Sequence, residues 1–159
     1  MQTVHLICVG KLKETYWVQA CAEYEKRLGA FCKFQITEVP ECKLPPQPSA
    51  AQIERALQAE GEKILQLAHG SVLIPLCIEG KALTSPELAQ HMETVALRGE
   101  STVSFLIGSS YGLCNNAKKQ GYLKLSLSNM TFPHQLARVM LCEQIYRAFQ
   151  IQTNGKYHK

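Results

Sequence analysis

A serine flanked by glycines is the most conspicuous short motif of this 159-residue chain. Residues 108–112, Gly-Ser-Ser-Tyr-Gly, follow the apolar run 103–107 and match G-x-S-x-G, in which a sharp strand-to-helix turn exposes a nucleophilic serine. Glu143 and His158 follow in the order in which α/β hydrolases place their acid and base. The motif is compatible with a hydrolase that uses Ser110, or with a glycine turn that only ends a strand.

The surroundings of the motif argue against a hydrolase. Residues 113–119 are a poor start for the helix that must follow the nucleophile, and Glu143 would have to act from the middle of a helix. The chain has no HGGG-like segment for an oxyanion hole and is short for that fold. We therefore keep the serine hydrolase only as a minor alternative.

Other catalytic patterns are missing from the sequence. There is no Walker A loop, no G-x-G-x-x-G and no HExxH. All 13 acidic residues are glutamates, which excludes every mechanism that needs an aspartate. We interpret His5, His69 and His91 as surface or packing residues, because none has a partner at metal-ligand spacing.

Cysteine usage and hydropathy limit where the chain functions. The seven cysteines, at positions 8, 21, 32, 42, 77, 114 and 142, are widely spaced and form no Cys-x-x-Cys pair. They predict free buried thiols in a reducing cytoplasm and no metal site. The longest apolar run, residues 72–78, is far below the ~20 residues of a membrane span, and no secretion signal is recognisable. The net charge of +4 permits an anionic partner without requiring one.

The C-terminal third offers a different kind of site. Residues 125–138 join a predicted strand to a predicted helix through small hydroxyl residues, and backbone amides at such a helix start could hold a polar ligand. The chain then ends with Lys156, Tyr157, His158 and Lys159 after Gly155. From the residues alone, this end is most simply a frayed tail.

Apolar spacing predicts the elements that must position these residues. Strands are expected over 4–9, 32–36, 72–74, 103–107 and 122–127, and helices over 17–28, 49–68, 85–95 and 133–151. Pro75 should end the third strand, and the prolines between 40 and 48 mark a loop. Alternating strands and helices indicate one α/β domain over residues 1–159, a parallel sheet covered by helices on both faces. Ligands of such sheets bind beyond the carboxyl ends of the strands, here after Ile74, Ile107 and Leu125.

The last predicted helix is apolar around nearly its whole circumference. A helix of this kind must be buried on more than one side. We expect it to form a dimer interface, with a core helix of a monomer as the alternative. Glu143 and Arg147 lie four residues apart in it and can pair, or form only a solvated stripe.

The whole chain resembles the RlmH family, also called YbeA-like, of ribosomal RNA methyltransferases in the SPOUT superfamily. The matching segments are 9–13 (VGKLK), 24–28 (YEKRL), 60–62 (EGE), 105–108 (FLIG), 128–135 (SNMTFPHQ), 143–148 (EQIYRA) and 157–159 (YHK). The last three segments together are highly specific for the family.

This resemblance implies a C-terminal trefoil knot, a homodimer and S-adenosylmethionine bound in the knot. It also implies the reaction, methylation of N3 of a pseudouridine in 23S rRNA on the assembled ribosome, without a metal or a membrane. The implied cofactor positions are Leu76, Gly108, Leu127, Ser128, Asn129, Met130, Thr131 and Phe132. They fall in the three strand-end loops identified above.

One position departs from the family pattern. The family has a second glycine after Gly108, and this chain has Ser109 there. If the position requires a positive φ, serine is disfavoured, which would affect how closely the cofactor can approach.

Methylation at N3 requires alignment of the base with the methyl group and removal of an imide proton. We predict His158 as the base or as a substrate-positioning group, with Tyr157 stacking on a base and Arg147 beside it. Arg138, Arg147, Lys156 and Lys159 are expected to hold RNA phosphates. A ribosome-binding module without catalysis is the second alternative, and it would not bind S-adenosylmethionine.

Overall fold

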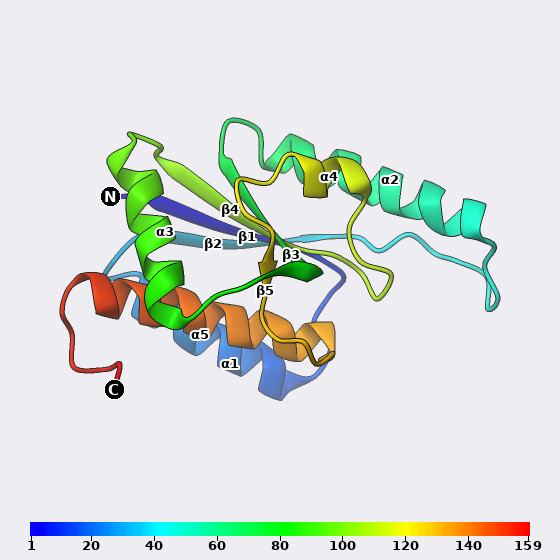
Figure 1. Cartoon of the computed structure of the whole chain (residues 1–159). Helices are drawn as coiled ribbons and strands as arrows, with labels where there is room; N and C mark the ends of the chain where they lie inside the picture. The colour runs from blue at the N-terminus through cyan, green and yellow to red at the C-terminus, as the bar shows by residue number, and fades with distance from the viewer.

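A computed structural model describes all 159 residues of the chain. Strands and helices alternate along it in the order β1 (Thr3–Val9), α1 (Thr15–Leu28), β2 (Lys33–Val39), α2 (Ala50–Leu67), β3 (Val72–Ala82), α3 (Ser85–Leu97), β4 (Thr102–Ile107), α4 (Asn115–Lys119), β5 (Leu125–Ser126) and α5 (His134–Gln152). The five strands form one parallel sheet in the order β2-β1-β4-β3-β5 (Figure 1). The predicted α/β class and the parallel sheet are confirmed.

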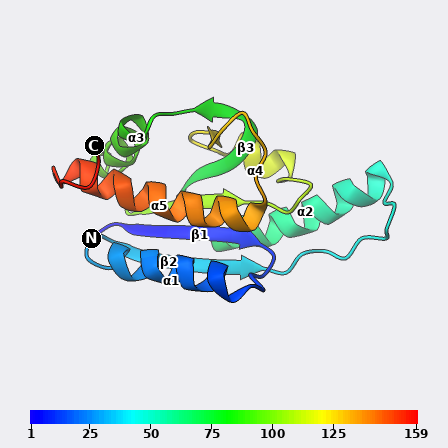
Figure 2. The same cartoon turned by 90° about the horizontal axis from the view of Figure 1, so that it is seen from below.

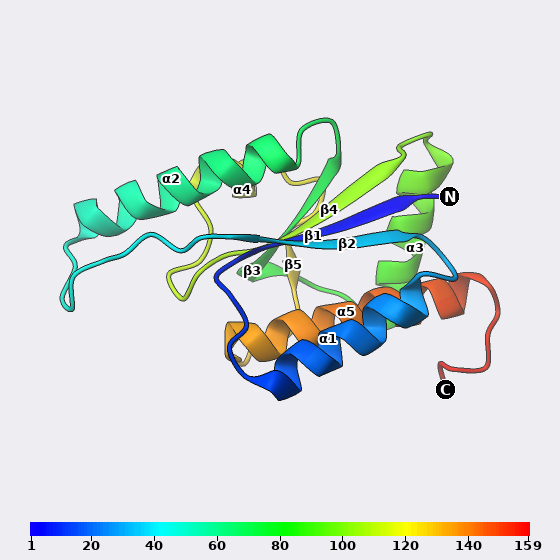
Figure 3. The same ribbon diagram turned by 180° about the vertical axis from the view of Figure 1, so that it is seen from behind.

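The central strand β1 shows why both faces of this sheet are covered. Successive side chains of a strand point to opposite faces. Val4, Leu6 and Cys8 belong to the larger core cluster, with residues of α1, α3 and α5. Ile7 and Val9 belong to the smaller cluster, with residues of α2 and α4. Views from below and from behind show the same division, with α1 and α5 side by side on one face (Figures 2 and 3).

Two helices begin at the residues that the sequence indicates. Ser49 and Gln52 form a capping box at the start of α2, with the two bonds at 2.8 and 3.2 Å. Thr84 and Glu87 do the same for α3, at 2.7 and 3.2 Å. Each box satisfies backbone N–H groups that the first helical turn leaves without a partner.

The third strand does not end at Pro75. It pairs with β4 from Val72 to Pro75 and with β5 from Leu76 onwards, so proline stands where the strand changes its neighbour. The missing backbone N–H therefore interrupts no continuous ladder, which is why the strand can pass through this residue. The expected fifth strand is shorter than predicted, and α4 was not predicted at all.

Much of the apolar surface of α5 is buried within a single chain. Leu141, Cys142, Ile145 and Ala148 are fully buried, because α5 packs between α1 and α3. This packing accounts for much of the apolar circumference without a second subunit. Other side chains of the helix, including Val139, Met140 and Tyr146, remain half-exposed.

The cysteines and histidines behave as the sequence suggests. All seven cysteines are free, and five of them are buried. His5 is buried and lies 2.7 Å from the Thr37 hydroxyl, while His91 lies 3.0 Å from the Tyr122 hydroxyl. None of the helices has the length and apolar character that crossing a membrane requires.

Candidate functional site: a cleft between β3, β4, β5 and α5

A cleft of about 580 Å³ opens between the middle of β3, the ends of β4 and β5 and the start of α5. Its volume lies within the range of about 300–1,000 Å³ that is usual for small-molecule sites. Seven of the eight predicted cofactor residues line it: Leu76, Gly108, Leu127, Ser128, Met130, Thr131 and Phe132. Asn129 is exposed and does not line the cleft.

Leu76 reaches this cleft from within a strand rather than from a loop. The strand β3 continues to Ala82, and its pairing with β5 is irregular between Leu76 and Lys81. The expectation of a loop after Ile74 is therefore wrong, although Leu76 does line the cleft. The irregularity holds part of the strand out of the ladder, on one wall of the cleft.

The glycine motif after β4 forms a tight turn. The Gly112 backbone N–H donates to the Ser109 carbonyl at 2.8 Å, and Gly112 has a φ of +90°. A Cβ atom on Gly108 would collide with the Gly112 carbonyl, so the turn itself requires glycine there.

Ser109 does not strain this turn. Its φ is not positive, so the departure from the family pattern has no backbone cost. Its hydroxyl accepts a bond from the Tyr111 backbone N–H at 3.3 Å. The Ser109 side chain therefore stabilises the turn by a hydrogen bond.

The loop of residues 127–132 carries backbone N–H groups that have no partner within the chain. The Ser126 hydroxyl donates to the Ser128 carbonyl at 3.0 Å, and the Ser128 hydroxyl accepts from the Met130 N–H at 3.0 Å. The other five backbone N–H groups of this loop donate to no atom of the chain. Four of these five donors, all but that of Asn129, belong to residues that line the cleft, so they are available to a ligand that carries acceptors.

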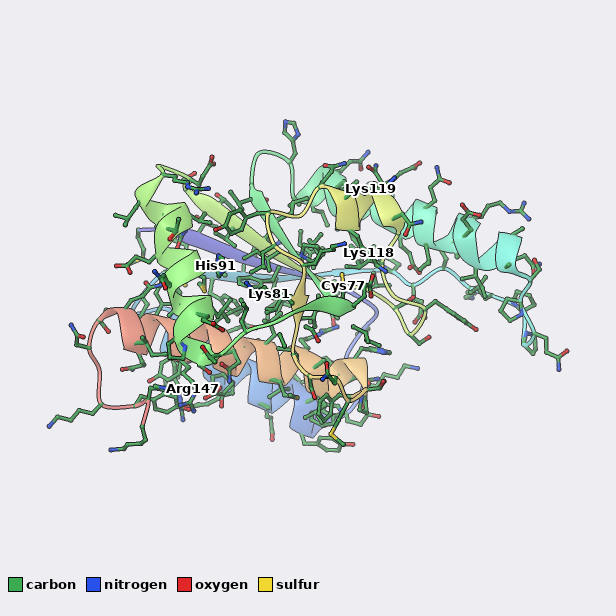
Figure 4. The ribbon with its side chains drawn as sticks, viewed as in Figure 1. Cys77, Lys81, His91, Lys118, Lys119 and Arg147 are labelled. Atoms are coloured by element: carbon green, nitrogen blue, oxygen red, sulfur yellow. The ribbon has the colours of Figure 1, made fainter.

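Two opposite charges stand at the cleft wall. Lys118 of α4 donates to the Glu79 carboxylate at 2.7 Å, and Cys77 lies beside them in the sheet (Figure 4). The bond from Lys118 holds the pKa of Glu79 below its ordinary value. Burial raises the pKa of Cys77, so its thiol stays protonated near neutral pH.

Lys118 and Glu79 were missed by the sequence analysis. They lie 39 residues apart, and neither belongs to a recognisable motif. The only hint in the sequence was that Lys118 is a basic residue that follows shortly after the glycine motif of residues 108–112.

The C-terminal tail is docked rather than frayed. The Tyr157 hydroxyl donates to Glu143 Oε1 at 2.9 Å, and Arg147 donates to the same oxygen at 2.7 Å. The His158 Nδ1 lies 3.2 Å from Arg147 Nη1, and the guanidinium lies over the Tyr157 ring at 4.6 Å. We call Glu143, Arg147, Tyr157 and His158 the tail cluster. The three residues predicted to be catalytic thus meet around Glu143, which was predicted to pair with Arg147 or, in the hydrolase alternative, to serve as the acid.

The aromatic residues of α1 and α5 support the tail cluster. Tyr157 makes an edge contact with Tyr146, with ring centroids 5.0 Å apart. Burial, together with the bond to Glu143, raises the pKa of Tyr157. The tyrosine therefore acts as a hydrogen-bond donor at physiological pH rather than as a phenolate.

The tail cluster and the cleft lie apart within one chain. Ala137 lines the cleft and Arg147 belongs to the tail cluster, ten residues later on α5. At about 1.5 Å of rise per residue, some 15 Å of helix separates them. Figure 4 shows the same separation between Arg147 and the pair Cys77 and Lys118.

The separation also bears on the hydrolase alternative. Ser110 lies in the cleft, while Glu143 and His158 are both engaged with Arg147 in the tail cluster. The three residues do not assemble into a triad within this chain.

The predicted phosphate ligands fall into two groups. Lys156 and Lys159 are exposed beside the tail cluster and can reach an external partner. Arg138 is 3% exposed and donates to Glu38 at 2.7 Å and to the Gly10 carbonyl at 3.1 Å. Arg138 is therefore a buried structural residue, and its assignment to RNA is wrong, because its guanidinium already has partners inside the fold.

No group of three or more metal-ligating side chains occurs in the structure. The chemistry of this cleft is instead that of backbone donors, hydroxyls and apolar walls, with one ion pair at its edge. These features are those of a site for a small polar ligand in an enzyme of the α/β class.

Comparison with known proteins identifies the family. A family described as "Predicted SPOUT methyltransferase" matches residues 1–158. The ribosomal RNA large subunit methyltransferase H of Exiguobacterium sibiricum is 46% identical over 157 residues, which are 98% of this chain and 99% of that protein. The chain therefore belongs to the SPOUT methyltransferase family, whose methyl donor is S-adenosylmethionine.

Two solved structures share the fold. A probable methyltransferase from Bordetella pertussis Tohama I superposes with a TM-score of 0.60 at 17% identity, covering 93% of this chain and 95% of that one. A probable methylase family protein from Haemophilus influenzae Rd KW20 gives 0.56 at 17% identity, covering 98% and 70%. The family model and the Exiguobacterium relative confirm the predicted family, and these structures confirm its fold.

Proposed function

We propose that this chain methylates N3 of a pseudouridine in 23S rRNA on the assembled ribosome, and does so as a homodimer with a C-terminal trefoil knot. The name of the Exiguobacterium relative supports an rRNA substrate. A ribosomal substrate also places the protein in the cytoplasm. The observation that carries the proposal is the row of free backbone donors at residues 127–132, in a cleft lined by seven of the implied cofactor positions.

The cleft residues fit S-adenosylmethionine. Four unpaired backbone N–H groups of cleft-lining residues can meet the acceptors of an adenine ring, and Leu76 and Leu127 can cover its faces. When bound there, the cofactor supplies an activated methyl group, so neither a covalent enzyme intermediate nor a metal is required. The task left to the protein is to hold the base in line and to accept a proton.

The proton of N3 must leave as the new N–CH₃ bond forms. His158 is the residue we assign to accept it or to position the base, with Tyr157 and Arg147 orienting the histidine. Lys156 and Lys159, both exposed, hold phosphates of the RNA. These groups are all parts of, or neighbours of, the tail cluster.

The homodimer follows from the separation of the two sites. Reacting atoms must come within about 3–3.5 Å of each other, yet about 15 Å of α5 separates Arg147 of the tail cluster from Ala137, which lines the cleft of the same chain. The tail of one subunit therefore serves the cleft of its partner. The half-exposed side chains of α5, among them Val139, Met140 and Tyr146, supply the contact surface.

Transfer of a labelled methyl group tests this function. Wild-type protein is incubated with labelled S-adenosylmethionine and either intact ribosomes or free 23S rRNA, and the modified nucleoside is identified by mass spectrometry. We expect N3-methylpseudouridine, formed faster on ribosomes. Calorimetry that detects no cofactor binding would instead favour the binding module, and labelling of Ser110 by a fluorophosphonate would favour the hydrolase.

A further inference from the structure

Large apolar side chains lie exposed around the cleft that is assigned to S-adenosylmethionine. Ile78 of β3, Tyr111 of the glycine turn and Met130 of the loop of residues 127–132 line this cleft, and the solvent reaches all three. We call that cleft the cofactor cleft and these three residues the apolar rim. Single exposed apolar residues are common, but several gathered at one cleft indicate a surface that another molecule covers.

The fold does not require the ring of Tyr111. The backbone N–H of this residue donates to the Ser109 hydroxyl at 3.3 Å and so belongs to the turn. The phenol hydroxyl, in contrast, bonds to no atom of the chain, and the residue is 48% exposed. The ring is therefore available to a partner, and it is the only aromatic group of the apolar rim.

Two lysines give the neighbouring wall a net positive charge. Lys118 lines the cofactor cleft and donates to the Glu79 carboxylate at 2.7 Å. Lys124 is exposed, and its charge adds to that bond in lowering the pKa of Glu79, so it lies near the same carboxylate. Two cations beside one anion leave a positive charge in excess at the edge of the cleft.

The chemistry of the apolar rim and the two lysines matches a nucleotide of an RNA strand. An unstacked base has two flat faces that stack on aromatic side chains, and the strand carries phosphates that bind lysine. The base that receives the methyl group must also lie close to the methyl donor. It therefore has to approach the cofactor cleft at the opening that the apolar rim borders.

We propose that the target nucleotide of the rRNA, turned out of its stack, lies on the apolar rim, with its base stacked on the Tyr111 ring and its phosphate near Lys118 and Lys124. Enzymes that modify a base extrude it in this way and hold it between aromatic and apolar side chains. The inference rests on the proposed function and names the contacts that bind its substrate. In the proposed dimer the tail of the other subunit reaches the same opening, so the base lies between the methyl donor and the proton acceptor.

Substitutions of Tyr111 that differ only in the ring test the stacking contact. Tyr111→Phe keeps the aromatic face and removes the unused hydroxyl, whereas Tyr111→Leu keeps an apolar side chain without an aromatic face. Tyr16→Leu, at an exposed tyrosine of α1, is the matched control. For each full-length variant we would measure ribosome affinity at several salt concentrations, the kinetics of methyl transfer, S-adenosylmethionine affinity by calorimetry and oligomeric state by light scattering.

We expect Tyr111→Leu to weaken ribosome binding about tenfold, because one base loses its stacking partner, and to raise KM by a similar factor. Tyr111→Phe and Tyr16→Leu should stay within about twofold of the wild type, because neither removes a stacking face from the apolar rim. Cofactor affinity and dimerisation should be unchanged in all three. Lys124→Ala should make ribosome binding less dependent on salt, whereas Tyr111→Leu should leave this dependence as in the wild type.

The tail of the other subunit is the competing occupant of the apolar rim. Tyr111→Trp, combined with Trp17→Phe, places the only tryptophan of the chain on the rim of the free protein. If the rim is open until RNA binds, acrylamide quenches the fluorescence of this ring, and Tyr157→Ala does not increase the quenching. Protection that disappears in Tyr157→Ala would show that the tail covers the ring and would overturn the proposal.

Three further results would overturn the assignment while leaving the proposed function intact. Unchanged ribosome affinity and KM in Tyr111→Leu would remove the base from the apolar rim. A loss of cofactor affinity in this variant would make the ring part of the cofactor site, and dissociation into monomers would make the rim an interface. If the wild type itself transfers no methyl group to ribosomes, the proposed function fails instead.

Discussion

Arg138 of α5 and Glu38 at the end of β2 form a 2.7 Å ion pair across 100 residues of sequence. The arginine side chain is 3% exposed and the glutamate side chain 38%, so the cation is the buried partner. The same guanidinium bonds to the Gly10 carbonyl at the end of β1. This contact holds the start of α5, which follows the loop of residues 127–132, against the carboxyl ends of β1 and β2.

The asymmetry of this pair predicts unequal effects of its two substitutions. Glu38→Gln should reduce the free energy of unfolding by about 3 kcal/mol, because it leaves a buried cation without its counter-charge. Arg138→Met should cost less, since it removes that charge together with a buried Nε that has no partner. Urea denaturation monitored by circular dichroism measures both. Equal losses, or a larger loss for Arg138→Met, would contradict this account.

The glycine turn after β4 gives a prediction about cofactor binding. Gly108→Ala places a methyl group against the Gly112 carbonyl and should distort the turn, weakening S-adenosylmethionine binding by tenfold or more. Ser109→Gly removes only a side-chain bond to Tyr111 and should change the affinity less than threefold. Calorimetry distinguishes the two variants. Normal affinity in Gly108→Ala would show that the turn does not shape the cofactor site.

Substitutions at two neighbouring residues of α5 distinguish the proposed dimer interface from the core of the chain. Met140 is half-exposed, so Met140→Glu should give a folded monomer. Leu141 is fully buried within one chain, so Leu141→Glu should unfold the protein by burying an unpaired charge. Light scattering and circular dichroism measure association and folding separately. A stable dimer from Met140→Glu would show that this face is not the interface.

A buried carboxyl on α2 predicts a dependence of stability on pH. Glu60 is 3% exposed, and burial raises its pKa, although a bond from the Cys42 backbone N–H at 2.9 Å opposes the shift. Because the folded-state pKa exceeds the unfolded one, this group destabilises the fold at neutral pH, and the penalty disappears as the pH falls through the folded-state pKa. Glu60→Gln should therefore be at least as stable as the wild type at pH 7.

The measurement is the free energy of unfolding of both proteins between pH 4 and pH 8. The difference between Glu60→Gln and the wild type should shrink on acidification. Glu79, whose pKa is lowered, changes stability in the opposite direction and is common to both proteins, so it cancels in the difference. A difference that does not change with pH would mean that Glu60 is not the titrating group.

Local sequence patterns predicted most of the helices and strands. They failed where contacts with residues distant in the sequence determine the structure. Capping boxes at Ser49 and Thr84 located two helices, because the signal lies within four residues. The strand through Pro75 could not be predicted, since the change of neighbour that tolerates proline depends on β4 and β5.

The site shows the same division between local and long-range signals. The implied cofactor positions could be named because they lie in segments that match the family. The ion pair of Lys118 and Glu79 could not be predicted, because folding brings these distant residues together. The burial of Arg138 could not be predicted either, because it depends on contacts with Glu38 and Gly10. The docking of the tail on Glu143 was likewise invisible, because a short terminal segment carries no periodicity.

The last prediction concerns that tail. Deleting Lys156, Tyr157, His158 and Lys159 should cost only about 1–2 kcal/mol of stability, because the segment contributes one bond to Glu143, one to Arg147 and a ring contact with Tyr146. Cofactor affinity should persist, since no residue of the tail lines the cofactor cleft of its own chain. Dimerisation should persist, since the proposed contact surface lies on α5. Methyl transfer to ribosomes should be lost.

Single substitutions within the tail show how much each residue contributes to methyl transfer. Lys159→Ala should weaken ribosome binding and flatten its dependence on salt, because one phosphate contact disappears. His158→Ala should lower the rate at saturating ribosome if the histidine takes part in the chemical step, and Tyr157→Phe tests the bond to Glu143 alone. A truncated protein that methylates ribosomes at the normal rate would show that the docked tail has no part in the reaction.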